Sequence, residues 1–225
     1  MYWLKRLADN RQEQSLATRL RLKRFAFFRD LLSSLPPPIR ILDVGGTENF
    51  WLRMGVDQLD GVEITLLNRT SSITTHPALK SVVGDARDMS DIEDKQFDVV
   101  FSNSVIEHVG NFEGQRKMAQ EVQRVGKRYF VQTPNRYFPI EPHFLVPFFQ
   151  FFPISVRVFL VRHFNLGWYP KTPERQKALA LVEEIKLLNE RELREIFPGA
   201  SVYREKILGL TKSLIVYNGW TEVNQ

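Results

Sequence analysis

Short apolar runs that end in glycine or polar residues alternate along this chain with stretches whose apolar residues recur every three or four positions. Runs of the first kind are typical of buried parallel strands, and the stretches between them are typical of helices. Because parallel strands need crossover connections, this alternation predicts a doubly wound, mostly parallel sheet with helices on both faces. The predicted strands cover residues 40–44, 63–68, 79–83, 97–102 and 128–132, and a predicted helix covers about 113–125.

The carboxyl-terminal part of the chain predicts an antiparallel hairpin at one edge of this sheet. Asn189 followed by Glu192 has the spacing of a capping box, which opens a short helix that ends before Pro198. Residues 201–208 and 211–217 then have the pattern of two short strands joined by a turn. With this edge hairpin, the predicted sheet has seven strands.

The amino-terminal segment is predicted to be a basic helix. Leucine and phenylalanine recur at helical spacing from about residue 9 to 35, and three prolines then end the helix. Residues 1–40 hold nine Lys or Arg against three Asp or Glu, although the whole chain has a net charge of only +5. We therefore predict a basic helical segment over residues 1–38 and one α/β domain over residues 39–225. Such a segment is a solvated helix face, or it attracts nucleic acid, anionic lipid or a phosphorylated substrate.

A stretch rich in aromatic residues and prolines, residues 138–170, interrupts the alternation. It is too irregular for a strand and too apolar for an ordinary surface loop, so we predict an insertion that lies over the site, helical from Pro153 to His163. Its aromatic residues form an apolar wall over a pocket, or else they pack into the core or a dimer contact. They are Phe144, Phe148, Phe149, Phe151, Phe152, Phe159, Phe164 and Trp168.

Composition narrows the classes of function. The chain has no cysteine, which excludes disulfides, thiolate metal sites and cysteine nucleophiles, and which fits a reducing compartment. The first residues lack the apolar run of a signal peptide, and no uncharged stretch has the length of a membrane span. We therefore expect a cytoplasmic protein whose only contact with a membrane is peripheral.

Polar residues follow four consecutive predicted strands, at the ends that meet at one edge of a parallel sheet. Asp43 precedes Gly45 and Gly46, and glycine there permits a tight turn and lets a ligand approach the backbone closely. Asn68 ends the second strand, where a polar side chain can hold the ribose hydroxyls of a nucleoside. The remaining polar residues are Asp85 after the third strand, and Ser102, Asn103, Glu107 and His108 at the fourth.

With these motifs, residues 40–135 resemble the class I S-adenosylmethionine (SAM)-dependent methyltransferases, especially the group acting on small molecules and lipids that carries a Glu-His pair after the fourth strand. The resemblance implies transfer of a methyl group from SAM to an acceptor oxygen or nitrogen, with S-adenosylhomocysteine as the product. It also implies the cofactor site: Asp43, Gly45 and Gly46 at the methionine part, Asn68 at the ribose, Asp85 and Ala86 at adenine, Ser102 and Asn103 beside the sulfonium, and Thr47, Arg69 and Arg87 adjoining them.

Three residues depart from the family pattern. Thr47 and Asn49 stand where the turn of the family usually carries its second and third glycines, and Asn68 replaces an acidic residue without bringing its charge. These changes leave open an inactive scaffold that binds the cofactor or a protein partner. A dehydrogenase is disfavoured, because the turn lacks the G-x-G-x-x-G spacing that a dinucleotide needs.

The candidate catalytic residues are His143, near Glu141, and His108, beside Glu107, since an imidazole titrates close to neutrality. A base is useful but not obligatory, because methyl transfer chiefly requires alignment of the acceptor with the methyl group. The alternative for either histidine is that it is a hydrogen-bonded structural residue with no catalytic role. The same four side chains are of types that ligate divalent ions, but no two have the helical spacing of an established metal motif, so we expect no metal site.

The aromatic stretch predicts a small hydrophobic or lipid-linked acceptor. The basic amino-terminal segment makes RNA the alternative acceptor, although we expect nucleic acid less. The absence of cysteine excludes the covalent route to a pyrimidine ring carbon, and the Ser-Asn-Ser-Val sequence after the fourth strand lacks the proline-aromatic motif of base-amine methyltransferases. Methylation of a ribose stays open. The sequence does not indicate an oligomeric state.

Overall fold

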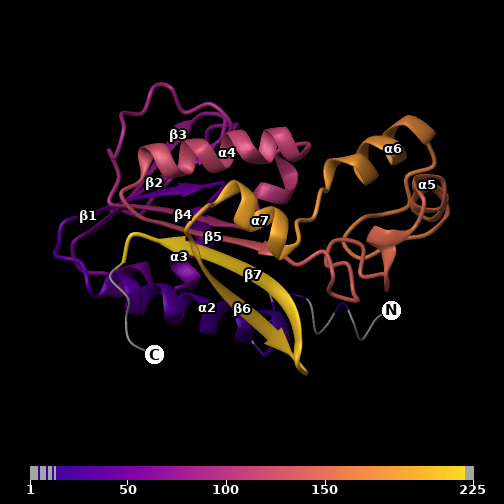
Figure 1. The fold of residues 1–225 in the computed structure, drawn as a ribbon, viewed down its shortest axis with the longest axis horizontal. Coiled ribbons are helices and arrows are strands. Elements are labelled where there is room, and N and C mark those ends of the chain that lie inside the picture. The colour runs from indigo at the N-terminus through magenta and orange to yellow at the C-terminus, as the bar shows by residue number, and fades with distance from the viewer. Residues whose placement is uncertain (1–4, 6–8, 10–11, 13, 221–225) are drawn as a thin grey trace.

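The computed structural model describes residues 5, 9, 12 and 14–220. Its strands are β1 (Ile39–Val44), β2 (Val62–Asn68), β3 (Leu79–Val83), β4 (Val99–Asn103), β5 (Tyr129–Pro134), β6 (Ser201–Ile207) and β7 (Leu210–Asn218). They form one seven-stranded sheet in the order β3-β2-β1-β4-β5-β7-β6 (Figure 1). The first five strands are parallel, and β7 runs antiparallel to both β5 and β6. The predicted fold class, including its antiparallel edge hairpin, is confirmed.

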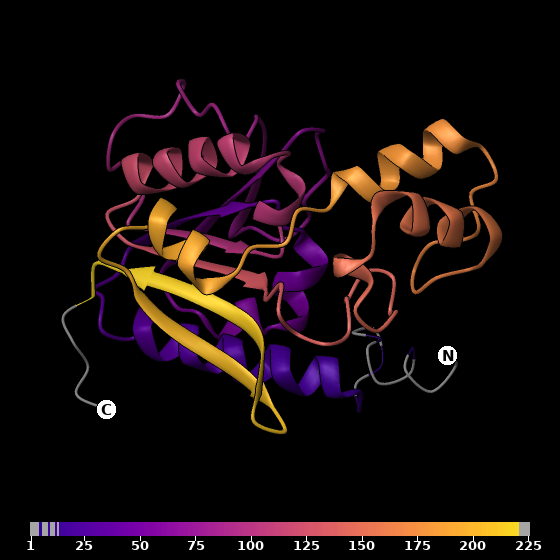
Figure 2. The same ribbon diagram turned by 45° about the vertical axis from the view of Figure 1, so that its right-hand side comes forward.

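Helices cover both faces of this sheet. The helices α2 (Leu16–Leu32) and α3 (Glu48–Arg53) lie on one face, and α4 (Phe112–Val125) and α7 (Glu190–Ile196) lie on the other (Figures 1 and 2). The capping box predicted for α7 is present. The side chain of Asn189 accepts a hydrogen bond from the backbone N–H of Glu192, and the side chain of Glu192 accepts one from the backbone N–H of Asn189. The arrangement leaves the carboxyl ends of the parallel strands open at one edge.

Each face of the sheet has its own apolar core. Ile41 of β1 packs in the cluster that contains Phe28 of α2, whereas the adjacent Leu42 belongs to the cluster that contains Met118 of α4. This division follows from the alternation of side chains along a strand. Full burial of a side chain of this kind contributes about 1.5–3 kcal/mol, so the two cores hold the helices firmly against the sheet.

The amino-terminal helix begins later than predicted. The side chain of Ser15 accepts a hydrogen bond from the backbone N–H of Thr18 and caps α2, so the helix starts at Leu16 and not near residue 9. Residues 10, 11 and 13 of the predicted helix lie outside the described residues. Phe25 of α2 packs in the same core as β1, and the predicted domain boundary near residue 38 stays a prediction.

The insertion forms a unit of its own beyond the end of β5. It contains α5 (Ile154–His163), which confirms the predicted helix, and it continues into α6 (Arg175–Glu184), which we had not predicted. Both views place these two helices beside each other and away from the layers that cover the sheet (Figures 1 and 2). A separate apolar cluster that includes Phe144, Val161 and Val182 holds them together. Among the described residues, no helix is both long enough and apolar enough to cross a membrane.

Candidate functional site

A cleft of about 710 Å³, here called the main cleft, opens where β1, β2, β3 and β4 end. Its walls come from the segments that follow these four strands, as expected for the carboxyl edge of a parallel sheet, and from Glu184 at the end of α6. Nine of the predicted site residues line it: Gly45, Gly46, Thr47, Asn68, Arg69, Asp85, Ala86, Arg87 and His108. Four others, Asp43, Ser102, Asn103 and His143, are not among its lining residues.

The turn after β1 depends on its two glycines. Gly45 has a φ of +77°, in the left-handed region that favours glycine. A β-carbon on Gly46 would lie 1.8 Å from Oδ2 of Asp43, so no side chain fits there while that carboxyl group keeps its place. The next residue, Thr47, accepts a hydrogen bond from the backbone N–H of Phe50 and caps α3. The departure of Thr47 from the glycine pattern therefore starts a helix.

Asp43 lies against this turn and does not line the main cleft. It is 1% exposed, and its Oδ2 accepts a hydrogen bond of 2.6 Å from the indole N–H of Trp51 in α3. Burial raises the pKa of the Asp43 carboxyl to about 7, against the opposing effect of the Trp51 hydrogen bond. In this position Asp43 connects β1 with α3.

The raised pKa of Asp43 predicts a pH-dependent stability. Because the carboxyl has a higher pKa in the folded chain than in the unfolded chain, its stabilising contribution is fully present below about pH 4 and is lost as the pH rises through about 7. Relative to the Asp43→Asn variant, the wild type should lose about 2–3 kcal/mol of unfolding free energy between about pH 5 and about pH 7. Urea unfolding at both pH values measures this difference.

The exposed Asp60→Asn variant is the matched control for this measurement. It should follow the wild type at both pH values. A difference between the wild type and Asp43→Asn that stays constant with pH would contradict the assignment of the shift to Asp43.

Asn68 joins the end of β2 to the turn after β1. Its Nδ2 donates a hydrogen bond of 2.8 Å to the backbone oxygen of Gly46. Among the described residues, no hydrogen bond is made by Oδ1 of Asn68, and this atom therefore remains an acceptor for a ligand in the main cleft.

Asp85 forms an ion pair on the wall of the main cleft that follows β3. Arg87 donates from Nε and Nη2 to the two carboxylate oxygens of Asp85, at 2.9 and 2.6 Å, and its backbone N–H donates to Oδ1. These hydrogen bonds lower the pKa of Asp85 to about 2. The carboxylate is thus charged and accepts hydrogen bonds only, on a wall that ligands can reach.

Ser102 and Asn103 hold the end of β4 to its neighbours. Ser102 is fully buried, and its hydroxyl donates to the backbone oxygen of Val44 in β1. The side-chain oxygen of Asn103 accepts a hydrogen bond from Arg24 of α2. The predicted contact of Ser102 and Asn103 with a sulfonium stays a prediction, since neither side chain lines the main cleft.

Arg24 is a buried residue that the sequence analysis did not single out. Its guanidinium forms hydrogen bonds to both carboxylate oxygens of Glu205 in β6, one of them at 2.9 Å, and another to Gln132 in β5. The side chains of Arg24 and Glu205 are 8% and 4% exposed. The signal available in the sequence was the position of Arg24 beside Phe25 and near Phe28, on the apolar side of the predicted helix.

Glu107, His108, Glu141 and His143 meet where the main cleft borders the insertion. Glu107 and His108 lie in a short turn after β4 (η2, Ile106–His108), and Glu141 and His143 lie at the start of the insertion. The rings of His108 and His143 stand edge to face with centroids 5.0 Å apart. Nδ1 of His143 lies 2.7 Å from a carboxylate oxygen of Glu141.

Burial and neighbouring charges together set the protonation of this group. It raises the pKa of Glu107 to about 6, and it lowers the pKa of His108 to about 4, with a further lowering from His143. Burial also opposes the charge of His143, but the hydrogen bond and charge of Glu141 outweigh it and raise the pKa of His143. His108 is therefore neutral at neutral pH.

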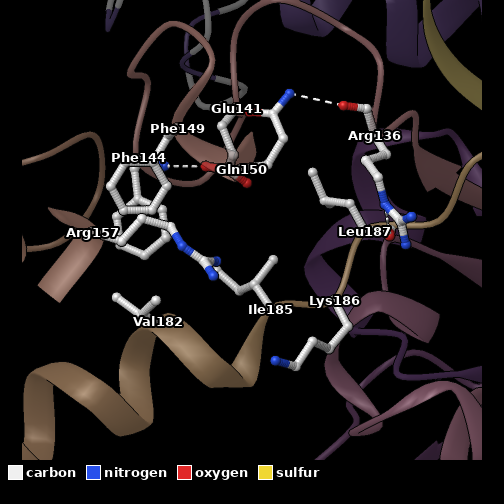
Figure 3. Close-up of a pocket in the computed structure, with 10 residues that line it drawn as sticks. All are labelled: Arg136, Glu141, Phe144, Phe149, Gln150, Arg157, Val182, Ile185, Lys186 and Leu187. Carbon is white, nitrogen blue, oxygen red and sulfur yellow. Dashed lines mark hydrogen bonds between the residues drawn. The ribbon is translucent and has the colours of Figure 1, made fainter. Parts of the chain in front are cut away.

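A second cavity, of about 160 Å³, lies within the insertion next to this group. Figure 3 shows the rings of Phe144 and Phe149 on one side of it, and Arg157 extending between them and Ile185. Glu141, which holds His143, also lines this cavity. The cavity thus combines apolar walls with basic side chains.

The chain is similar to several known proteins. Residues 43–129 match the family model described as a methyltransferase domain. An uncharacterized protein of Mycobacterium tuberculosis strain H37Rv is 29% identical over 152 residues, which are 61% of this chain and 50% of that protein. A second uncharacterized protein, from M. tuberculosis strain CDC 1551, matches to the same extent. The chain spans about half the length of these curated relatives.

Solved structures share the fold at low sequence identity. A SAM-dependent methyltransferase of Methanosarcina mazei is 14% identical, with a TM-score of 0.54 and coverage of 85% of this chain and 95% of that one. A chain from the complex of the Haloferax volcanii Trm112 methyltransferase activator is also 14% identical, with a TM-score of 0.51 and coverage of 95% and 96%. Residues 43–129 are thus similar to the methyltransferase domain family, and the fold is that of the class I SAM-dependent methyltransferases.

Proposed function

We propose that this chain transfers the methyl group of SAM to an oxygen or nitrogen of a small hydrophobic or lipid-linked acceptor. The main cleft is the observation that carries the proposal, because residues from four strand ends line one cavity whose volume is typical of small-molecule sites. Its place in the sheet is the usual ligand site of a doubly wound fold.

The side chains of the main cleft suit the parts of SAM. Oδ1 of Asn68 accepts a hydrogen bond from a ribose hydroxyl, and the Asp85 carboxylate accepts one from the adenine amino group. Gly45 and Gly46 keep the turn after β1 free of side chains. When bound, SAM supplies a methyl group on a positively charged sulfur. The lone pair of the acceptor forms the new bond to the methyl carbon, and the electrons of the broken carbon–sulfur bond stay on sulfur. The acceptor proton leaves to a base or to water.

The predicted catalytic pair supports an acceptor site at the insertion. His108 lines the main cleft, and its ring contacts that of His143, which belongs to the insertion. An acceptor that enters from the insertion therefore passes these two side chains before it reaches the main cleft. Their role is to orient the acceptor atom toward the methyl group, which is the chief requirement of this reaction.

The surface of the insertion supports a hydrophobic acceptor. Phe144 and Phe149 are buried in its core, so part of the aromatic stretch has a packing role. Other members are half exposed on the surface, and exposed apolar side chains gathered on one segment mark a binding surface. These are Phe148, Phe151, Phe159, Phe164 and Trp168.

Labelled SAM tests the function and the class of acceptor together. With isotope in the methyl group and fractionated cell extract, we expect label in the lipid-soluble pool, and calorimetric titration should show that SAM binds. The Phe159→Ser/Phe164→Ser variant should raise the KM for the labelled acceptor at least tenfold, because about 1.5–3 kcal/mol of contact is lost for each ring.

The control for this variant is Leu208→Ser, which changes a 98% exposed residue in the hairpin turn between β6 and β7. It should leave the KM unchanged. Label in RNA or in a polar pool would contradict the proposed acceptor, and a chain that does not bind SAM would be a scaffold.

A further inference from the structure

Three potential metal ligands from separate parts of the chain come together at the edge of the main cleft. Glu107, His108 and His143 each offer an atom suited to a metal ion, and these atoms all lie within 4.8 Å of one another. The residues come from the turn after β4 and from the segment after β5, which are neighbours in the sheet. The spatial grouping is thus a product of the fold, and no short sequence motif contains it.

Glu107 presents a buried oxygen that lacks a partner. The residue is fully buried, and its Oε2 accepts a hydrogen bond of 3.0 Å from the hydroxyl of Thr133. Its other oxygen, Oε1, is buried and has no hydrogen-bond partner among the described residues. Leaving a buried carboxylate oxygen unsatisfied is costly, and a bound cation removes this cost.

His143 is oriented as metal-binding histidines are. Its Nδ1 lies 2.7 Å from Oε1 of Glu141, so Nδ1 carries the proton and Nε2 is the nitrogen offered to a ligand. Oε2 of Glu141 accepts the backbone N–H groups of His143 and Phe144, at 2.9 and 2.7 Å. A carboxylate that fixes the tautomer and direction of a histidine in this way is a regular neighbour of metal ligands.

We propose that Glu107, His108 and His143 bind one divalent first-row transition-metal ion such as Zn²⁺, and that Glu141 positions His143 for it. Two imidazoles and one carboxylate suit such an ion better than Mg²⁺ or Ca²⁺, which prefer oxygen ligands. Three protein ligands leave coordination positions open. Since His108 lines the main cleft, the open side adjoins that cleft, where the ion holds an oxygen of the acceptor. This last role, unlike the metal binding itself, rests on the proposed function.

Metal binding is measured on the full chain after treatment with a chelator and its removal. Titration with Zn²⁺, followed by calorimetry and by competition with a chromophoric chelator, should show one saturable site. Co²⁺ in place of Zn²⁺ should give visible absorption bands of a low-coordinate site. The His143→Ala and Glu107→Gln variants should each weaken Zn²⁺ binding at least tenfold, and Glu141→Gln should weaken it about 10–100-fold, as removal of such an orienting carboxylate does.

The control variant is His163→Ala, because His163 is exposed on α5 and its Nδ1 bonds the backbone oxygen of Phe159. It should bind Zn²⁺ as the wild type does. Circular dichroism of each variant without metal checks the fold, and Glu107→Gln serves if His143→Ala does not fold. No saturable site in the wild type, or equal losses in His143→Ala and His163→Ala, would overturn the inference.

SAM titration in the presence of chelator separates this inference from the proposed function. If the chain binds SAM but no metal ion, the metal site is wrong and the methyltransferase proposal stands. If it binds the ion at the three named residues but not SAM, the metal site stands and the proposed function fails.

Discussion

Replacement of Arg24 by methionine is expected to lower the free energy of unfolding by about 3–4 kcal/mol. The substitution keeps most of the apolar stem but leaves the carboxylate of Glu205 buried without its main partner, and an uncompensated buried charge costs about 3–5 kcal/mol. Nζ of Lys212 lies 3.5 Å from Glu205 and offsets part of this loss, which places the effect at the lower end. Urea unfolding followed by circular dichroism measures the change.

Arg29→Met is the matched control for Arg24→Met, because it changes an exposed arginine of the same helix. A surface substitution of this kind should change stability by less than about 0.5 kcal/mol. Equal losses in the two variants would show that the helix needs basic residues in general, and would contradict a specific role for the buried pair.

The structural role of Arg24 extends toward the main cleft. The same guanidinium that meets Glu205 also bonds Gln132 of β5 and the side chain of Asn103 at the end of β4. Arg24 thus connects the amino-terminal helix with three strands of the sheet. One prediction for the basic amino-terminal segment is a helix face that is exposed to water. The buried Arg24 does not fit that prediction.

The fold was predictable because its signals are local. The run Ile41 to Val44 is buried on both sides of the strand, since helices cover both faces, and the capping box at Asn189 and Glu192 uses residues only three positions apart. α6 escaped prediction for a physical reason. In this ten-residue helix the buried positions are Ala178 and Val182, so its apolar stripe is short and its contacts lie within the insertion.

The position of the main cleft could be predicted from the sequence, but the directions of the side chains around it could be predicted less well. Strand order alone brings the ends of four parallel strands together, and this placed Asn68 and Asp85 around one cavity. Which way a side chain points at a strand end depends on its neighbours in three dimensions. Ser102 bonds the backbone of β1, and Asp43 bonds Trp51 of a helix that the sequence did not predict.

The cluster of Glu107, His108 and His143 shows the limit of arguments from spacing. We expected no metal site because these residues lack the short, regular separation of helical metal motifs. β4 and β5 are adjacent and parallel, so the segments that follow them emerge side by side although α4 separates them in the chain. The ends of two adjacent strands can bring potential metal ligands together, just as one helix can. That two strands are adjacent is known only from the topology of the sheet.

Replacement of Asp85 by alanine is expected to weaken SAM binding about 10–100-fold. Asp85 lines the main cleft and is ionised at neutral pH, because hydrogen bonds from Arg87 hold its pKa at about 2. A hydrogen bond to a charged group contributes about 1.5–3 kcal/mol, and each 1.4 kcal/mol is a factor of about ten in affinity. Calorimetric titration with SAM measures the effect, and the exposed Asp91→Ala variant is the acidic control.

The Arg87→Gln variant decides how Asp85 acts on the cofactor. If Asp85 contacts SAM directly, Arg87→Gln should keep most of the affinity, since the carboxylate remains in the main cleft without its ion-pair partner. If Asp85 acts only by holding Arg87 over the main cleft, the two variants should lose affinity equally. Unchanged affinity in Asp85→Ala would contradict both routes and would remove this wall of the main cleft from the cofactor site, because Asp85 is the acidic side chain that the segment after β3 presents there.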